Sequence, residues 1–181
     1  MKSTLIIGGA RSGKSSFAQK LALKSGGTVL FVATAEAGDK EMQRRIEAHR
    51  KARPLIWKTL EVTTHIGSHI SRNIGQAQTV IIDCITLLIN NVFQQLDKES
   101  DDTLVEKAVM AEIDELIGCI DRINARFIMV TNEVGLGLVP ADRVSRLYRD
   151  WLGKANQMLA HHAEEVIIIV AGLPVTVKAA Q

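Results

Sequence analysis

A glycine-rich segment near the N-terminus has the residue types and spacing that hold phosphate groups. Its sequence fits G-x-x-x-x-G-K-S, and it lies between the apolar run 5–7 and the helix-forming run 17–22. Glycines let successive main-chain N–H groups turn toward phosphate oxygens, and the N-terminus of a following helix adds positive potential. A glycine-rich turn without a ligand is the alternative. We expect a bound nucleoside triphosphate at Gly8, Gly9, Ala10, Arg11, Ser12, Gly13, Lys14 and Ser15.

Two residues of this segment and a more distant acid could perform phosphoryl chemistry together. Lys14 would reach the outer phosphates, and Ser15 would offer its hydroxyl to Mg²⁺. Asp83 ends the apolar run 80–82 and could hold the same ion, directly or through water. Aspartate is also a good helix N-cap, so a structural role is the alternative. Beside a complete phosphate-binding segment we favour the magnesium role.

A second polar cluster, 131–137, follows another apolar run and begins Thr-Asn-Glu. Asn132 or Glu133 could orient a substrate hydroxyl or take its proton, as phosphoryl transfer to an alcohol requires. The same residues could simply supply turn geometry to a loop. The sequence favours neither interpretation.

A basic segment, 44–54, carries a single histidine, His49, among arginines and lysines. Nearby cations lower the pKa of an imidazole and favour its neutral, nucleophilic form, and the same cations attract polyphosphate. A basic helix is more often a solvated face and less often a nucleic-acid patch. No aromatic residues are interleaved to stack bases, which argues against nucleic acid. Composition alone does not favour a catalytic role for His49.

The elements that must position these groups alternate along the chain. Short apolar runs, each expected to be a buried strand, alternate with helical patterns, which predicts a mostly parallel α/β sheet covered on both faces. Ligands of such sheets lie at the carboxyl ends of the strands. The expected strands are 5–7, 29–33, 57–62, 80–83, 127–131, 166–170 and the edge strand 175–177, and the expected helices are 17–22, 39–51, 104–123 and a long helix that Pro140 opens.

Length and composition limit the class of protein. The chain has 181 residues, 46% of them hydrophobic, and a net charge of only +2, so we expect one globular domain and no partner nucleic acid. Cys84 and Cys119 lie in apolar segments and are expected to be reduced, buried thiols of a cytoplasmic protein. Since the first strand starts at once, we expect no signal peptide, and no apolar run reaches membrane-spanning length.

Several motifs, in the same order along the chain, resemble one family. They are GGARSGKS, the Ala33-Thr34-Ala35 turn, RIEAHRKARP with Trp57 and Glu61, the acid Asp83 with Cys84-Ile85-Thr86 and later Asn90, and TNEVG before Pro140. The chain resembles the bifunctional adenosylcobinamide kinase/adenosylcobinamide-phosphate guanylyltransferases of cobalamin biosynthesis over essentially its whole length. The resemblance implies a single phosphate-loop domain over 1–181, similar in fold to RecA, and a homotrimer.

The resemblance also implies two reactions. ATP or GTP would phosphorylate adenosylcobinamide, and GTP would then guanylylate a histidine, from which GMP passes to adenosylcobinamide phosphate to give adenosylcobinamide-GDP. The guanylylated histidine falls on His49, and Ala48 stands where some members have a second histidine. Besides residues 8–15, the GTP-contacting positions fall on Ala33, Thr34, Ala35, Arg50, Lys51, Ala52, Arg53, Glu61 and Asp83.

Three questions stay open at the level of sequence. The phosphate loop presents the γ-phosphate, whereas His49 must reach the α-phosphorus, so we hypothesise that its helix moves between two positions. A small-molecule kinase without nucleotidyl transfer and a RecA-type nucleic-acid module are the alternative functions. His65 and His69 are interpreted as a solvated helix face, and His161 and His162 as the last turn of the long helix.

Overall fold

The computed structural model describes residues 2–36, 40–51, 53–97 and 101–180, with the backbone alone at 40–42, 45, 48 and 49. In chain order the elements are β1 (Ser3–Gly8), α1 (Lys14–Ser25), β2 (Val29–Ala33), α2 (Lys40–Lys51), β3 (Lys58–Glu61), α3 (Ile66–Asn73), β4 (Thr79–Asp83), α4 (Ile85–Gln94), α5 (Asp102–Arg122), β5 (Arg126–Val130), α6 (Arg143–His162), β6 (Glu165–Val170) and β7 (Leu173–Lys178).

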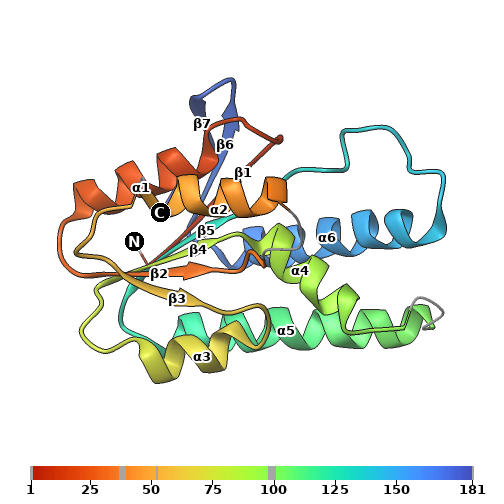
Figure 1. Cartoon of the computed structure of the whole chain (residues 1–181), viewed down its shortest axis with the longest axis horizontal. Coiled ribbons are helices and arrows are strands. Elements are labelled where there is room, and N and C mark those ends of the chain that lie inside the picture. The colour runs from red at the N-terminus through yellow and green to blue at the C-terminus, as the bar shows by residue number, and fades with distance from the viewer. Residues whose placement is uncertain (1, 37–39, 52, 98–100, 181) are drawn as a thin grey trace.

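The described strands form one seven-stranded sheet in the order β3-β2-β4-β5-β1-β6-β7. The first six run parallel to their neighbours, and β7 returns antiparallel along β6 at the edge. Helices cover both faces, with α1 and α2 on one side and α3 and α5 on the other (Figure 1). The predicted α/β class with a mostly parallel sheet is therefore confirmed, and so is the edge strand near 175–177.

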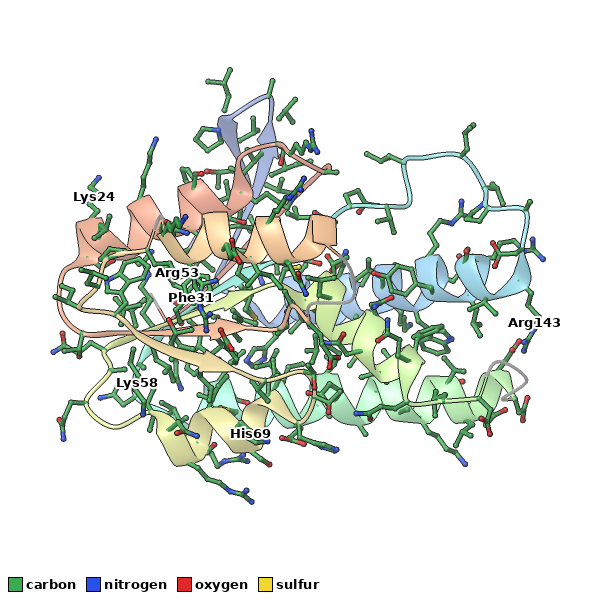
Figure 2. All side chains as sticks on the ribbon, in the orientation of Figure 1. Lys24, Phe31, Arg53, Lys58, His69 and Arg143 are labelled. Carbon is green, nitrogen blue, oxygen red and sulfur yellow. The ribbon has the colours of Figure 1, made fainter. Side chains whose placement is uncertain are left out.

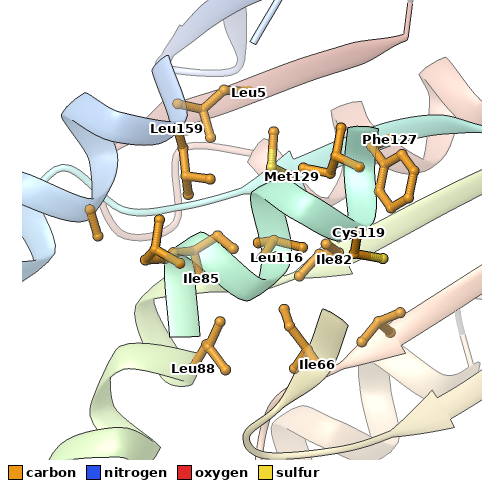
Figure 3. Close-up of a cluster of buried hydrophobic side chains, with 14 of the residues drawn as sticks. Leu5, Ile66, Ile82, Ile85, Leu88, Leu116, Cys119, Phe127, Met129 and Leu159 are labelled. Atoms are coloured by element: carbon orange, nitrogen blue, oxygen red, sulfur yellow. The ribbon is translucent and has the colours of Figure 1, made fainter. Parts of the chain in front are cut away.

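Each face of the sheet is buried against its own helices because successive strand residues point to opposite sides. On β1, Ile6 belongs to the smaller core with Ala18 and Ala22 of α1, whereas Leu5 belongs to the larger core under α3, α4, α5 and α6. Figure 3 shows this larger core, where Leu116 of α5 and Leu159 of α6 meet the sheet. Strands buried on both faces explain the continuous apolar runs of the sequence.

Two helix assignments differ from those expected. The long helix α6 begins at Arg143 and not at Pro140, because the Asp142 carboxylate accepts a hydrogen bond from the Ser145 main-chain N–H at 2.8 Å and caps the helix there. The helix α4 was not expected, because its run of apolar residues resembles that of a strand. Among the described residues, no helix is long and apolar enough to cross a membrane.

Candidate active site

The carboxyl ends of five neighbouring strands open onto one large cavity. Ala33 pairs in register with Glu61 on one side and with Asp83 on the other, and Asp83 pairs in turn with Val130. These four residues, from β3, β2, β4 and β5, all line a cavity of about 1170 Å³, and the loop after β1 closes its other end. The parallel topology thus gathers polar groups that lie far apart along the chain.

The loop 8–15 takes the form that its glycines allow. A Cβ atom at Gly8 would lie 2.5 Å from the carbonyl oxygen of Ile169, and Gly13, the N-cap of α1, has a φ of +99°. Residues from Ala10 to Ser15 line the cavity, so the N-terminus of the twelve-residue helix α1 is directed toward it. Main-chain N–H groups and a helix N-terminus at one point form a binding site for phosphate.

Lys14 is nearly buried at this end of the cavity. Its Nζ donates a hydrogen bond to the Gly9 carbonyl oxygen at 2.6 Å, which holds the ammonium group over the loop. Burial lowers the pKa of Lys14, while the nearby Cys84 and Asp83 act in the opposite direction. A nucleotide phosphate would supply the negative charge that favours the charged form of this lysine.

The segments after β2 and β4 are tied together beneath the cavity. Thr34 is fully buried, and its hydroxyl bridges the main chain of Cys84, whereas Ala33 and Ala35 line the cavity itself. Burial, followed by Asp83, raises the pKa of the Cys84 thiol to about 11. A thiol of this kind stays protonated at neutral pH, as expected for a packed group and not a nucleophile.

The basic segment contributes two arginines to the opposite wall. Arg50 pairs with Glu61 through a contact of 2.6 Å between its guanidinium and the carboxylate. Arg53 lies with its Cζ 3.8 Å from the centre of the Phe31 ring (Figure 2). The Phe31 ring in turn stacks on Trp57. Nε and Nη1 of Arg53 are buried and have no hydrogen-bond partner among the described residues. Orphan donors on a cation at a cavity wall are suited to an anionic ligand.

Comparison with known proteins agrees with this geometry. The family model described as cobinamide kinase / cobinamide phosphate guanyltransferase matches residues 4–177. The chain belongs to this family. It is 40% identical to the bifunctional adenosylcobalamin biosynthesis protein CobU of Escherichia coli over 179 residues, which cover 96% of this chain and 98% of that protein. It is likewise 40% identical to the protein of that description, CobP, of Pseudomonas aeruginosa over 174 residues, or 96% of each chain.

A solved structure supports the fold alone. The RadB recombinase superposes with a TM-score of 0.52 over 92% of this chain and 73% of the recombinase, at 13% sequence identity. This agrees with the expected likeness to RecA-type domains. It carries no information on the substrate, since identity at this level reflects the fold only.

Most of the family-derived nucleotide positions come together in this member of the cobinamide kinase / cobinamide phosphate guanyltransferase family. Those that line the cavity are Ala10, Arg11, Ser12, Gly13, Lys14, Ser15, Ala33, Ala35, Arg50, Arg53, Glu61 and Asp83. Thr34 lies below its surface, and Lys51 is exposed outside its lining. His49 is in the last turn of α2, but its side chain and the whole of Ala52 lie outside the described residues.

Some residues that line the cavity were not predicted from the sequence to do so. His65 and His69 both line the cavity; His65, the N-cap of α3, has a side chain that is 71% exposed, and His69 is half-buried within α3, so both are accessible to solvent from the cavity. The start of α3 is held in place by α5, where the buried carboxylate of Glu112 accepts hydrogen bonds from the main-chain N–H groups of His65 and Ile66. Thr86 was likewise not singled out as a cavity residue, although it follows Asp83 closely. Its proximity to Asp83 and its place in the family motif Cys84-Ile85-Thr86 were the signals that could have indicated it.

The structure distinguishes between the two candidates of the cluster 131–137. Asn132 lines the cavity, whereas Glu133 is absent from the lining, and its carboxylate accepts a hydrogen bond from the Gly135 main-chain N–H. The asparagine and not the glutamate therefore lines the site.

Proposed function

We propose that the chain phosphorylates adenosylcobinamide with ATP or GTP and then transfers GMP from GTP, through a guanylylated His49, to adenosylcobinamide phosphate. The products are adenosylcobinamide-GDP and pyrophosphate. The observation that carries this proposal is that one cavity joins the phosphate loop and Asp83 to Arg50 and Arg53, which closely follow His49 in the chain. A kinase needs the first set of groups, and the cations beside a nucleophilic imidazole suit nucleotidyl transfer.

In the kinase step, the acceptor hydroxyl oxygen forms a bond to the γ-phosphorus while the bond from γ-phosphorus to the β–γ bridging oxygen breaks. Lys14 and the main-chain N–H groups of residues 8–15 offset the negative charge on the outer phosphate oxygens. Ser15 and Asp83 would hold Mg²⁺, since both line the same cavity and oxygen ligands from one carboxylate and one hydroxyl suit this ion. Bound there, the ion supplies Lewis-acid neutralisation of the phosphate charge.

In the guanylyl transfer, an imidazole nitrogen of His49 forms a bond to the α-phosphorus of GTP, and pyrophosphate leaves with the electrons of the α–β bridging bond. A phosphate oxygen of adenosylcobinamide phosphate then attacks the same phosphorus, and the P–N bond breaks. Two displacements through a covalent intermediate replace one harder displacement. Arg50 and Arg53 would spread the charge that develops on the α-phosphate, together with Lys51 if α2 moves between the two steps.

The wider setting of the protein forms part of the proposal. We infer a single kinase/guanylyltransferase domain over residues 1–181, a cytoplasmic location and a homotrimer. Exposed apolar side chains support an oligomer, because several lie near one another in sequence and would be covered by a neighbouring subunit. These include Leu136, Leu138 and Val139 in one loop and Leu55 and Ile56 in another.

Labelling with nucleotide tests the proposal directly. GTP labelled at the α-phosphate should leave acid-labile, alkali-stable label on the protein, and His49→Ala should abolish this label while the phosphorylation of adenosylcobinamide continues. The matched variant His161→Ala, at the exposed end of α6, should label like the wild type. Label that survives His49→Ala contradicts the histidine route. Kinase activity without any label favours a simple small-molecule kinase, and a salt-dependent shift of DNA or RNA favours a nucleic-acid module.

A further inference from the structure

The strand β5 lies between the two parts of the phosphate site. Its last residue, Val130, pairs in register with Ile6 of β1, which leads into the phosphate loop, and with Asp83 of β4. The chain continues from Val130 through the buried Thr131 to Asn132, which lines the cavity together with Lys14 and Asp83. Asn132 therefore lies in the same cavity as the residues expected to hold the outer phosphates and Mg²⁺.

We propose that the carboxamide of Asn132 is a catalytic group of the kinase step that holds the acceptor hydroxyl of cobinamide, a primary or secondary alcohol, toward the γ-phosphate. We further infer that Thr86 and Asn156 are positioning residues for it. The inference rests on the proposed kinase function and adds to it the residue that orients the acceptor.

The main chain of Asn132 is held on both sides. Its N–H donates a hydrogen bond to Thr86 Oγ1 at 2.7 Å, and its carbonyl oxygen accepts one from Asn156 Nδ2 at 3.0 Å. Asn156 is itself fixed, since its Oδ1 accepts a hydrogen bond from the hydroxyl of the buried Thr131 at 2.7 Å. The Tyr148 hydroxyl donates a hydrogen bond to the Thr86 carbonyl oxygen at 2.9 Å and so holds Thr86 in place. Helices α4 and α6 therefore fix the backbone of one cavity residue.

The side chain of Asn132, in contrast, is available to a ligand. Its carboxamide has no hydrogen-bond partner among the described residues, although four residues hold the main chain around it. The neighbouring Glu133 also contributes its main-chain N–H to the phosphate loop, bonding the Gly8 carbonyl oxygen at 3.0 Å. The main chain of Asn132 is thus fixed by hydrogen bonds, whereas its side-chain amide has no partner among the described residues. This is the arrangement expected of a preorganised hydrogen-bonding group.

A neutral amide suits the chemistry of this step. Phosphoryl transfer to an alcohol passes through a loose transition state, in which positioning contributes more than a strong base. A hydrogen bond to Asn132 fixes the hydroxyl oxygen in line with the γ-phosphorus and the leaving oxygen. The hydroxyl oxygen bonds to phosphorus, the nucleoside diphosphate leaves with the electrons of the broken bond, and the hydroxyl proton passes to a phosphate oxygen.

Comparing phosphorylation with guanylylation distinguishes a catalytic role of Asn132 from a structural one. Asn132→Ala should lower kcat for phosphorylation of cobinamide roughly 10- to 100-fold, with little change in KM for the nucleotide. Guanylylation of the protein by α-labelled GTP should stay within about twofold of the wild type, because that step uses no alcohol. Thr86→Val should act in the same direction, and Thr86→Ser, which keeps the acceptor for the Asn132 N–H, should restore activity. Asn124→Ala, an exposed asparagine before β5, is the matched control.

Each outcome bears on a different claim. If Asn132→Ala retains wild-type kcat, or if Glu133→Gln abolishes phosphorylation instead, the inference is wrong. If Asn132→Ala lowers guanylylation and phosphorylation equally with a lower melting temperature, the residue is structural and the inference is also wrong. A wild-type protein that phosphorylates no cobinamide contradicts the proposed kinase itself, and that result is distinguishable because it appears before any variant is made.

Discussion

Thr34 and Cys84 are joined by two hydrogen bonds between neighbouring strand ends. The Thr34 hydroxyl accepts from the Cys84 main-chain N–H at 2.8 Å and donates to the Cys84 carbonyl oxygen at 2.7 Å. The Thr34 main-chain N–H also donates to the Asp83 carbonyl oxygen at 3.3 Å. One buried side chain thus fixes the backbone next to the proposed magnesium ligand Asp83, although the sequence suggested only a nucleotide contact for it.

Replacement of this threonine should weaken both the fold and the site. Thr34→Val keeps the shape but leaves the main-chain N–H of Cys84 without its partner, whereas the Cys84 carbonyl oxygen still accepts a hydrogen bond from the Leu88 N–H. The loss should lower the free energy of unfolding by about 1–3 kcal/mol. Thr34→Ser keeps the hydroxyl and should cost much less. Urea unfolding measures both, with Thr103→Val on the exposed side of α5 as the control. Equal stability of the valine and serine variants would show that the two hydrogen bonds are unimportant.

The contrast between loop 8–15 and Thr34 shows what a sequence can reveal. The phosphate site is built from residues that are neighbours in the chain: β1, the glycines, Lys14 and α1. The local sequence was therefore enough to predict it. The segments after β2 and β3 are instead connected by Asn91 of α4, whose Nδ2 donates to the carbonyl oxygens of Thr34 at 2.8 Å and Thr63 at 3.0 Å. These partners are far away in sequence, and an asparagine within an apolar helix carries no signal of them.

The residues that line the cavity wall were also difficult to predict from the local sequence. The charge pattern indicates that 44–54 is basic, but the fold is needed to show that Arg50 and Arg53 line the cavity whereas Arg44 and Lys51 do not. Side-chain direction at the end of a helix depends on how the helix packs on the sheet, and a local pattern of charges does not determine it.

Arg53 should contribute strongly to the binding of an anionic nucleotide. Its buried Nε and Nη1 groups lack a partner among the described residues, and hydrogen bonds to a charged group contribute about 1.5–3 kcal/mol, so Arg53→Met should weaken GTP binding roughly 10- to 100-fold. Arg53→Lys should restore little, because an ammonium group cannot reproduce the planar stack on Phe31. Calorimetric titration with GTP gives the affinities. Arg44→Met, which removes an exposed charge from α2, should bind GTP almost normally.

Full rescue of GTP binding by lysine would contradict this reasoning, since charge alone would then suffice. Unchanged binding by Arg53→Met would instead show that the two orphan donors receive no ligand atom.

The thiol of Cys84 should react slowly and only at high pH. Burial, then the charge of Asp83, raises its pKa from 9.0 to about 11, so that at pH 8 its thiolate fraction is about 100-fold below that of an ordinary cysteine. The contribution of this thiol to the free energy of unfolding is fully present below pH 9 and is lost as the pH rises through 11. The reason is that the folded state disfavours the thiolate more than the unfolded state does. Iodoacetamide labelling of a Cys119→Ala protein between pH 7 and 11 measures the curve, and urea-unfolded protein is the reference. A half-point near 9 in the folded protein would contradict the burial argument.

Glu112 should stabilise the wall that carries His65 and His69. Its carboxylate accepts hydrogen bonds from the His65 N–H at 2.7 Å and the Ile66 N–H at 3.0 Å, and thus caps α3 from a neighbouring helix. Glu112→Ala leaves the buried Ile66 N–H and the partly buried His65 N–H without this acceptor and should lower the free energy of unfolding by about 1–3 kcal/mol, measured in urea. Glu106→Ala, on the exposed side of α5, should change it little because that carboxylate is in solvent. Because His65 and His69 line the cavity beside this cap, Glu112→Ala should also weaken the binding of ligands to the cavity. If Glu112→Ala unfolds at the same urea concentration as the wild type, its two hydrogen bonds to α3 do not stabilise the fold.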